Sequence, residues 1–206
     1  MSTTGIWIAL LLCFIGLAPV TEVRSREFGL QSSENPAFLA DVDRTIKLEI
    51  VIRAPVEKVW WAWTTRDGIK SFFAPDCDLD LRVLGKYDIL FAPSAPVGRR
   101  GAEGNLVLAI QEGRMLSFTW DAPPTLPEIR KQRTSVVIRL LPVDQNTTRL
   151  IFRQTGWGDS EEWTKAHDYF EGAWGDVVLP RLKHSLEVGP LDWKNPPEKL
   201  EKAKRT

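Results

Sequence analysis

The chain has 206 residues, and its 27 lysine and arginine residues balance 27 aspartate and glutamate residues. This zero net charge gives no electrostatic reason for binding nucleic acid or an anionic membrane surface. Apolar residues make up 43% of the sequence, which is enough for the core of one domain of about 150 residues. The nine tryptophans favour either a heavily packed core or an aromatic-lined cavity.

An uninterrupted apolar run occupies residues 6–20. It is shorter than the roughly 20 apolar residues of a membrane span and fits the hydrophobic region of a secretory signal peptide. We therefore expect a signal peptide over residues 1–25, a linker over residues 26–44, and a secreted or periplasmic protein. Because no lysine or arginine precedes the run, an uncleaved N-terminal membrane anchor and a cytosolic start are the alternatives. After cleavage Cys77 would be the last thiol, so the mature domain would have no disulfide and no thiolate metal site.

The next segment predicts a strand followed by two short helices. Apolar and polar residues alternate over residues 45–52, as in a strand with one buried face. Pro55 suits the first position of a helix, and apolar residues recur after it at helical spacing at Val56, Val59, Trp60 and Trp63. A second helical turn is predicted by Ile69, Phe72 and Phe73, and Pro75 stops it.

Further alternating runs predict five or six more strands. They cover residues 79–83, 87–91, 106–110, 116–120, 136–140 and 150–154. The inward series of the third of these runs is Leu106, Leu108 and Ile110. Segments rich in proline or glycine at residues 92–104 and 122–131 predict loops between the strands.

The last predicted element is a long helix. Asp159 or Ser160 suits its N-cap, and the Gly-Pro pair at residues 189–190 suits its end. One face carries Trp163, His167, Phe170, Trp174, Val177, Val178 and Leu182. Pro180 removes a backbone donor, so we expect the helix to bend as it crosses the sheet. The charged, proline-interrupted residues 191–206 predict a frayed tail.

Several of these segments resemble the helix-grip superfamily, also called SRPBCC or START-like. They are A-P-V-E-K-V-W-W-A-W-T-T at residues 54–65, G-N-L-V-L-A-I-Q-E-G-R-M-L-S-F-T-W at 104–120, T-R-L-I-F-R-Q-T-G-W at 148–157 and A-W-G-D-V-V-L-P-R-L at 173–182. Within the superfamily, the chain looks most like the branch named after the C-terminal domain of the activator of heat-shock-protein (Hsp90-type) ATPase.

The resemblance implies an α+β helix-grip domain over residues 45–190. In this fold a curved antiparallel sheet of six or seven strands wraps around a long C-terminal helix, a short helix pair follows the first strand, and a hydrophobic cavity lies between sheet and helix. Members bind lipids, hormones and polyketide-like molecules, and a few catalyse reactions. The branch often has a histidine where this chain has Gln154.

The patterns place a set of mostly aromatic side chains inside the predicted cavity between sheet and helix. They are candidate ligand-binding residues: Tyr87, Phe91, Phe118, Trp120, Phe152, Gln154, Trp163, His167, Phe170 and Trp174. An apolar cavity with a few fixed polar groups is typical of small-molecule sites. For any one aromatic ring, solid packing is the alternative interpretation. Gln154 needs a hydrogen-bond partner from the protein or a ligand, unless it lies in water at the open end of the sheet.

His167 is the sharpest single candidate for chemistry, because a neutral imidazole facing the sheet could exchange a proton with a bound ligand. The alternative is a core or rim histidine satisfied by a neighbouring group. One histidine without an evident orienting carboxylate is not a catalytic constellation, so we assign no catalytic residue. We also expect no cofactor and no metal. The acidic run Asp76, Asp78 and Asp80 resembles a calcium loop only superficially.

We therefore expect a protein that holds a small apolar or amphipathic ligand, with no catalysis assumed. It should have no nucleic-acid partner, and it should contact a membrane only through an uncleaved N-terminal segment. One alternative is a cofactor-free enzyme of the cyclase, dehydratase or hydrolase type, with His167 as acid or base and Gln154 or Tyr87 orienting the substrate. The other is a regulator of a heat-shock-protein ATPase, by family analogy alone.

Overall fold

The computed structural model describes residues 44–197 and 200–206. The predicted signal peptide, and the predicted linker up to its last residue, lie outside these residues. None of the helices in the described part of the chain has the length and hydropathy of a membrane span.

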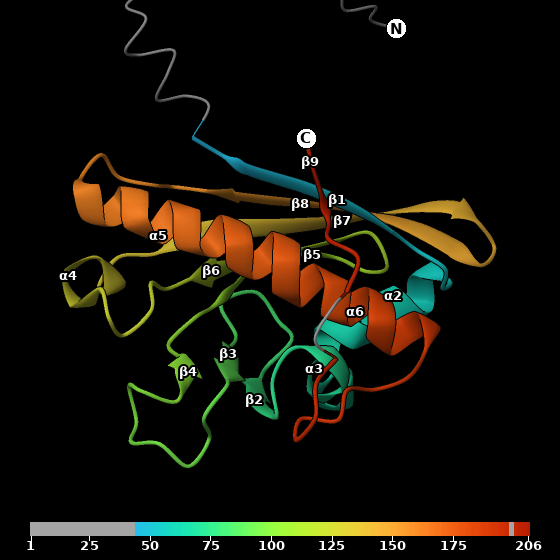
Figure 1. Cartoon of the computed structure of the whole chain (residues 1–206), viewed down its shortest axis with the longest axis horizontal. Coiled ribbons are helices and arrows are strands. Elements are labelled where there is room, and N and C mark those ends of the chain that lie inside the picture. The colour runs from blue at the N-terminus through green and yellow to red at the C-terminus, as the bar shows by residue number, and fades with distance from the viewer. Residues whose placement is uncertain (1–43, 198–199) are drawn as a thin grey trace, which may run out of the picture. The chain divides into compact units, whose positions relative to one another are not determined.

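Antiparallel strands form a main sheet of six strands and a second sheet of three (Figure 1). The spatial order in the main sheet is β5 (Val107–Gln111), β6 (Met115–Trp120), β7 (Thr134–Asp144), β8 (Thr147–Thr155), β1 (Ile46–Ile52) and β9 (Lys204–Arg205). The second sheet consists of β2 (Asp76–Leu79), β3 (Tyr87–Leu90) and β4 (Gly101–Ala102). Together with the C-terminal helix described below, this arrangement confirms the predicted α+β helix-grip fold.

The alternating sequence determines which face of the main sheet is buried. In β1 the buried residues are every second one, namely Ile46, Leu48, Ile50 and Ile52. Leu48 lies opposite Phe152 of β8, and Phe152 lies opposite Ile138 of β7. Because side chains on one face of a sheet line up across the strands, these rows form one continuous apolar surface for a helix to cover.

Two short helices, α2 (Val56–Thr64) and α3 (Arg66–Phe72), follow β1 as predicted. Pro55 lies directly before α2, where its missing N–H breaks no helical hydrogen bond. Thr65 caps α3 by accepting a hydrogen bond of 3.0 Å from the backbone N–H of Gly68. Trp63 of α2 is 1% exposed, so the helix pair buries its apolar stripe in the core.

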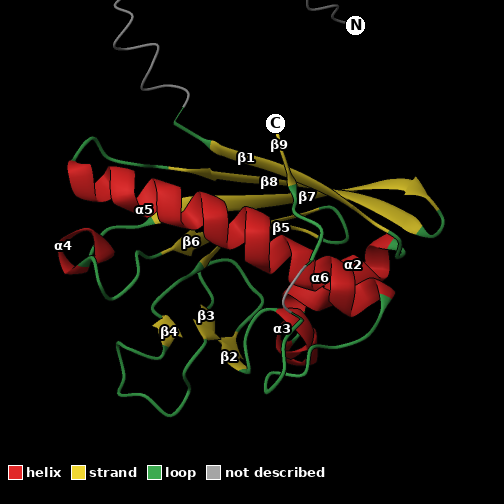
Figure 2. Ribbon diagram, in the orientation of Figure 1, coloured by secondary structure: helices red, strands yellow, loops and turns green. Residues whose placement is uncertain are grey.

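The long C-terminal helix crosses one face of the main sheet (Figure 2). It consists of α5 (Glu161–Gly172), a π-helical segment η1 (Ala173–Val178) and α6 (Leu179–Glu187). Ser160 is its N-cap and accepts a hydrogen bond from the backbone N–H of Trp163, as one of the two predicted caps.

Pro180 is accommodated by the π-helical segment and by the C-terminal tail. In a π-helical turn the N–H of residue 180 would donate to the carbonyl of Gly175, but proline has no N–H. The backbone N–H of Ala203 donates to that carbonyl instead, at 2.8 Å. The tail therefore supplies the hydrogen bond that Pro180 removes from the helix.

The prediction of a frayed tail is wrong for the last four residues of the chain. Ala203 is 4% exposed, and β9 pairs with β1 at the edge of the main sheet. The backbone N–H of Thr206 donates to the carbonyl of Lys47 at 3.0 Å. The charged composition concealed this, because an edge strand is held by its backbone and leaves its charged side chains in water.

Two predicted strands differ from the observed ones. The run at residues 79–83 is a strand only up to Leu79, and Leu81 and Val83 are exposed at the turn that follows. In β5 a bulge between Val107 and Ala109 shifts the register. Val107 therefore faces the core, whereas Leu106 and Leu108 of the predicted inward series are each 37% exposed. A bulge reverses the alternation that the sequence pattern assumes.

The tail contacts predict that truncation after Lys202 lowers the free energy of unfolding. We expect a loss of about 2 kcal/mol, because each lost backbone hydrogen bond contributes about 1 kcal/mol. Urea unfolding followed by tryptophan fluorescence measures this change. Lys204→Gln alters only an exposed side chain of β9 and should leave the unfolding midpoint unchanged. A truncated chain as stable as its parent would show that the tail contributes nothing.

Candidate functional site

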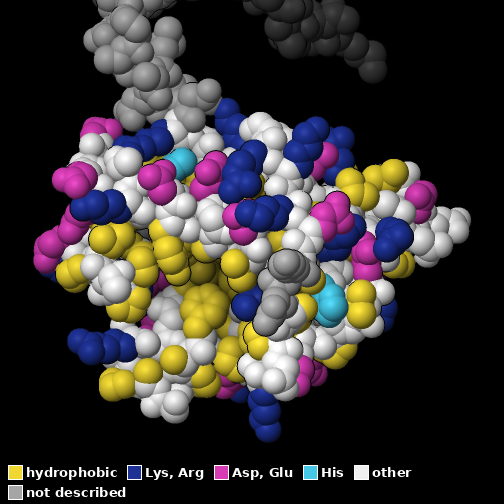
Figure 3. All heavy atoms as spheres, viewed as in Figure 1, with side chains coloured by type: hydrophobic (Ala, Val, Ile, Leu, Met, Phe, Trp, Pro, Cys, Tyr) yellow, Lys and Arg dark blue, Asp and Glu magenta, His cyan; other side chains and the backbone are white. Residues whose placement is uncertain are grey.

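An apolar cleft opens between the long helix and the segments that follow β3 and β6. It contains two hollows, of about 90 Å³ and about 50 Å³. Both are lined by Phe91, Trp120, Tyr169 and Phe170, and we call the space between these four side chains the aromatic cleft. Figure 3 shows a hollow among apolar side chains beside the long helix. At its mouth the exposed fractions are 48% for Phe91 and 55% for Tyr169.

Behind the cleft, aromatic side chains fill the space between sheet and helix where a cavity was predicted. Trp174 packs at its centre, with ring centroids 4.7 Å from Phe152, 5.0 Å from Trp120 and 5.5 Å from Phe73. Farther in, Tyr87 stacks on Phe118 at 4.3 Å. Phe118, Phe152 and Tyr87 are fully buried and line neither hollow of the aromatic cleft, so the structure places them in solid core. Trp174 closes the floor of the smaller hollow.

Tyr87 has no free hydroxyl for a ligand. The hydroxyl donates a hydrogen bond of 2.8 Å to the carbonyl of Trp63. Burial raises the pKa of Tyr87 well above its ordinary value of 10.0, because the phenolate would lose its hydration. The side chain therefore links β3 to helix α2 as a neutral phenol.

Gln154 faces inward and is fully buried, and all its partners are protein groups. Its Nε2 donates to the hydroxyl of Thr134 at 2.8 Å, and its Oε1 accepts from Nε1 of Trp174, also at 2.8 Å. The Thr134 hydroxyl in turn donates to the carbonyl of Trp120 at 3.0 Å. This network ties the long helix to β8, β7 and β6, and it leaves no amide group of Gln154 for a ligand.

His167 and Trp163 lie on α5, outside the aromatic cleft. Trp163 belongs to a second, small apolar cluster with Ala122, Ile129 and Ala166. The imidazole of His167 meets the ring of Trp157 edge-on at 5.2 Å, and its Nδ1 lies 3.5 Å from a carboxylate oxygen of Asp168. Neither His167 nor Trp163 lines the aromatic cleft, and His167 occupies the position of a rim histidine.

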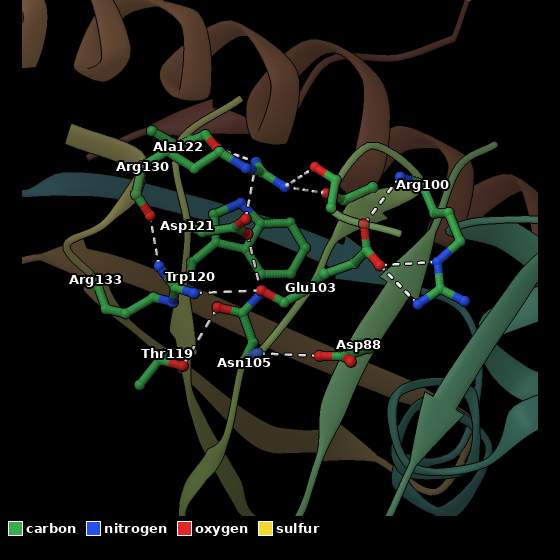
Figure 4. Close-up of polar contacts among 12 residues, drawn as sticks. Asp88, Arg100, Glu103, Asn105, Thr119, Trp120, Asp121, Ala122, Arg130 and Arg133 are labelled. Atoms are coloured by element: carbon green, nitrogen blue, oxygen red, sulfur yellow. Dashed lines mark hydrogen bonds and ion pairs between the residues drawn. The ribbon is translucent and has the colours of Figure 1, made fainter. Parts of the chain in front are cut away.

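The charged residues of the cleft are Asp121 and Arg130, which the sequence patterns missed (Figure 4). Asp121 directly follows β6, where continued alternation after the buried Trp120 would turn it outward, yet it is 3% exposed. Its Oδ1 accepts from Nδ2 of Asn105 at 3.0 Å, and its Oδ2 lies 2.8 Å from Nη1 of Arg130, an ion pair without good hydrogen-bond alignment. Burial outweighs these partners and raises the pKa of the Asp121 carboxyl.

Arg130 acts as a clamp at the mouth of the cleft. It lies at the end of α4 (Pro127–Arg130), a short helix after the proline-rich segment. Besides its ion pair with Asp121, its guanidinium donates to the carbonyls of Ala122 and Gly101, the latter at 2.8 Å. The segment around Gly101, the residues after β6 and helix α4 thus meet at one side chain. A run of prolines before a lone arginine carries no periodic signal that could have predicted this contact.

Within the described residues, no group of three or more histidine, cysteine, aspartate or glutamate side chains could hold a metal ion. Cys77 is a free, buried thiol, and burial raises its pKa to about 11. At neutral pH it is therefore a neutral thiol and a poor nucleophile.

Comparisons with known proteins agree with this architecture. The sequence model of the family described as activator of Hsp90 ATPase homolog 1-like protein matches residues 53–187. The chain belongs to this family. The predicted helix-grip superfamily membership is thereby confirmed. Comparison with curated protein sequences gives no significant match.

Solved structures with the same fold include the following three. Protein MLL2253 from Mesorhizobium loti is 25% identical, with a TM-score of 0.51, over 69% of this chain and 93% of its own. The Aha1 dimer from Colwellia psychrerythraea is 23% identical, with a TM-score of 0.53, over 70% of this chain and 97% of its own. Protein EF2215 from Enterococcus faecalis is 23% identical, with a TM-score of 0.55, over 82% of this chain and 89% of its own.

The buried network around Gln154 predicts a specific loss of stability. Gln154→Leu leaves the indole N–H of Trp174 without an acceptor, so we expect the free energy of unfolding to fall by about 2 to 4 kcal/mol. Gln111→Leu, the same substitution at an exposed position of β5, is the control and should change it by less than about 0.5 kcal/mol. Urea unfolding of both variants makes the comparison, and equal stabilities would contradict the network.

Asp121 predicts a pH dependence of stability. Its pKa is raised above the ordinary 3.8, so the folded protein holds this proton more tightly than the unfolded chain does. The stabilisation is present below about pH 4 and is lost as the pH rises through the raised folded-state pKa. We expect Asp121→Asn to abolish this loss, so that the parent loses stability relative to the variant from about pH 4 upwards. Urea unfolding over a pH series measures this, with Asp159→Asn as a surface control. Parallel curves of unfolding free energy against pH for the parent and Asp121→Asn would contradict the prediction.

Proposed function

We propose that this protein binds a small apolar or amphipathic molecule in the aromatic cleft. The observation that carries the proposal is that aromatic side chains are exposed to solvent in a partly closed cleft. The core next to this cleft is packed. Phe91 and Tyr169 stand at the mouth, and Trp120 and Phe170 form the buried wall. Concave apolar surface with a few polar groups at its end is the usual form of a small-molecule site.

The size of the cleft limits the ligand. An enclosed apolar cavity of about 150 Å³ holds a benzene ring. The two hollows, of about 90 Å³ and about 50 Å³, have four lining residues in common. A ligand that occupies both would therefore place one ring, or a short alkyl chain, between the aromatic side chains. Larger lipids would extend out of the mouth past Tyr169.

Membership of the family supports this proposal at the level of the fold. The fold is compatible with ligand binding, and the relatives reported above share it at identities of 25% or less. We do not extend the proposal to catalysis. The cleft's charged groups, Asp121 and Arg130, are engaged with each other, and the polar groups of Tyr87 and Gln154 are engaged with the protein.

The proposal is tested with a neutral probe, 4-phenylbutan-1-ol, added to isotopically labelled protein. We expect chemical-shift changes to cluster at Ala102, Ala122 and Ala173, whose side chains line the cleft. Native mass spectrometry of the gently purified protein, combined with a metabolite screen, then searches for the natural ligand. Shift changes spread evenly over the surface, or none at all, would contradict a site in the cleft.

A substitution that fills the cleft should block the probe. Ala173 lines the smaller hollow, and Ala173→Leu would occupy that space. We expect the affinity for 4-phenylbutan-1-ol to fall about tenfold, which is the contribution of about two buried methylene groups. Isothermal titration calorimetry measures the change.

The matched control is the neighbouring position on the same helix. A methyl group added at Gly172 would meet nothing within 4 Å, so Gly172→Ala should leave the affinity unchanged. Equal affinities of Ala173→Leu and its parent would place the probe outside the cleft.

A further inference from the structure

We infer that the ligand of the aromatic cleft carries a carboxylate, bound by Arg99 and Arg133 in a groove that continues the cleft. The inference rests on the proposed function, because the cleft supplies the apolar half of the site. It adds the chemical class of the ligand, an aryl or short alkyl carboxylic acid in its anionic form.

The groove joins the cleft at a shared wall. It has a volume of about 480 Å³ and is lined by Asp121, Pro124 and Arg130, each of which also lines the larger hollow of the cleft. On its other sides are Arg99, Glu103, Lys131 and Arg133. On the path we infer, a molecule whose ring lies in the cleft extends past Pro124 and Arg130 and places its other end in the groove.

The charges of the groove do not balance. Both of its carboxylates are engaged, since Glu103 forms an ion pair with Arg100 at 2.7 Å and Asp121 forms one with Arg130 at 2.8 Å. Lys131 is paired with Glu128 at 3.1 Å, on the surface. In residues 44–197 and 200–206, no ion pair is formed by Arg99 or Arg133. Two guanidinium groups therefore line the groove without an ion-pair partner of their own.

Arg133 is held in place without being neutralised (Figure 4). Its Nη1 donates to the carbonyls of Arg130 at 2.6 Å and Gln132 at 3.1 Å, and its Nη2 donates to the carbonyl of Glu103 at 3.3 Å. Carbonyl oxygens position the guanidinium without forming an ion pair, and its charge acts on Asp121, which already pairs with Arg130. Its Nε–H has no acceptor among the described residues, and the edge of a guanidinium formed by Nε and Nη2 is one that matches a carboxylate.

The apolar cleft and the charged groove together favour a ligand that is both apolar and anionic over a ligand with only one of these properties. A purely apolar ligand would leave both guanidinium groups unused. A free small anion would bind an exposed groove weakly, because water and salt screen the attraction. A ring anchored in the cleft raises the local concentration of its own carboxylate next to Arg133, so the two halves reinforce each other.

The test compares 4-phenylbutanoate with 4-phenylbutan-1-ol, which differ in the charged head. Isothermal titration calorimetry at low salt should show the acid binding the parent protein about tenfold more tightly than the alcohol, and the difference should shrink as salt is added. The double variant Arg99→Gln, Arg133→Gln should bind both probes equally, with its affinity for the alcohol unchanged. Arg99→Gln alone should lose part of the preference, and since Arg99 makes no ion pair it serves as the variant that keeps the fold if the double variant does not.

Arg114→Gln removes an exposed arginine that lines neither the cleft nor the groove and should keep the full preference for the acid. If the parent binds the two probes equally, this inference fails and the proposed function stands. If neither probe binds, both fail. A preference that survives in the double variant, or acetate binding as tightly as 4-phenylbutanoate, would also overturn the inference.

Discussion

The hydrogen bond between Trp174 and Gln154 fixes the position of the long helix on the sheet. The indole N–H and the side-chain amide are both buried, and each finds its partner only in this arrangement. Because an unpaired buried polar group costs more than a typical hydrogen bond contributes, helix and sheet cannot slide past each other without a penalty. The same contact sets the ring of Trp174 against Trp120 and Phe152, which fills the centre of the fold.

A filled centre moves the candidate binding site to the mouth. There the wall is made by segments that have little regular structure, and Arg130 holds them together through Asp121 and the carbonyls of Ala122 and Gly101. The clamp holds the wall of the cleft in place beside the solid core. The ion pair of Asp121 and Arg130 also lines the neighbouring groove, so the apolar cleft lies next to two guanidinium groups that form no ion pair among the described residues.

Prediction from the sequence succeeded where residues repeat with a regular period. The alternation in β1 and the helical stripe that includes Trp174 identified strands, helix and buried face, and with them Trp120 and Phe170 of the cleft. It was wrong where the period is broken, as at the bulge in β5, where Val107 rather than Leu108 turns inward. Such a bulge depends on the neighbouring strand, which no local pattern describes.

The sequence by itself determined the family, the order of the elements and the apolar faces that meet, because these follow from the spacing of side chains along one chain. Only the tertiary structure decided what fills the space between those faces. The sequence allowed Gln154 to hydrogen-bond a ligand, but in the fold its amide is hydrogen-bonded to Thr134 and Trp174. Asp121 acquires its role from Asn105 and Arg130, and Arg133 is positioned in part by the carbonyl of Glu103 from a distant segment. Contacts of that kind depend on three-dimensional packing, which the periodicity of neighbouring residues does not encode.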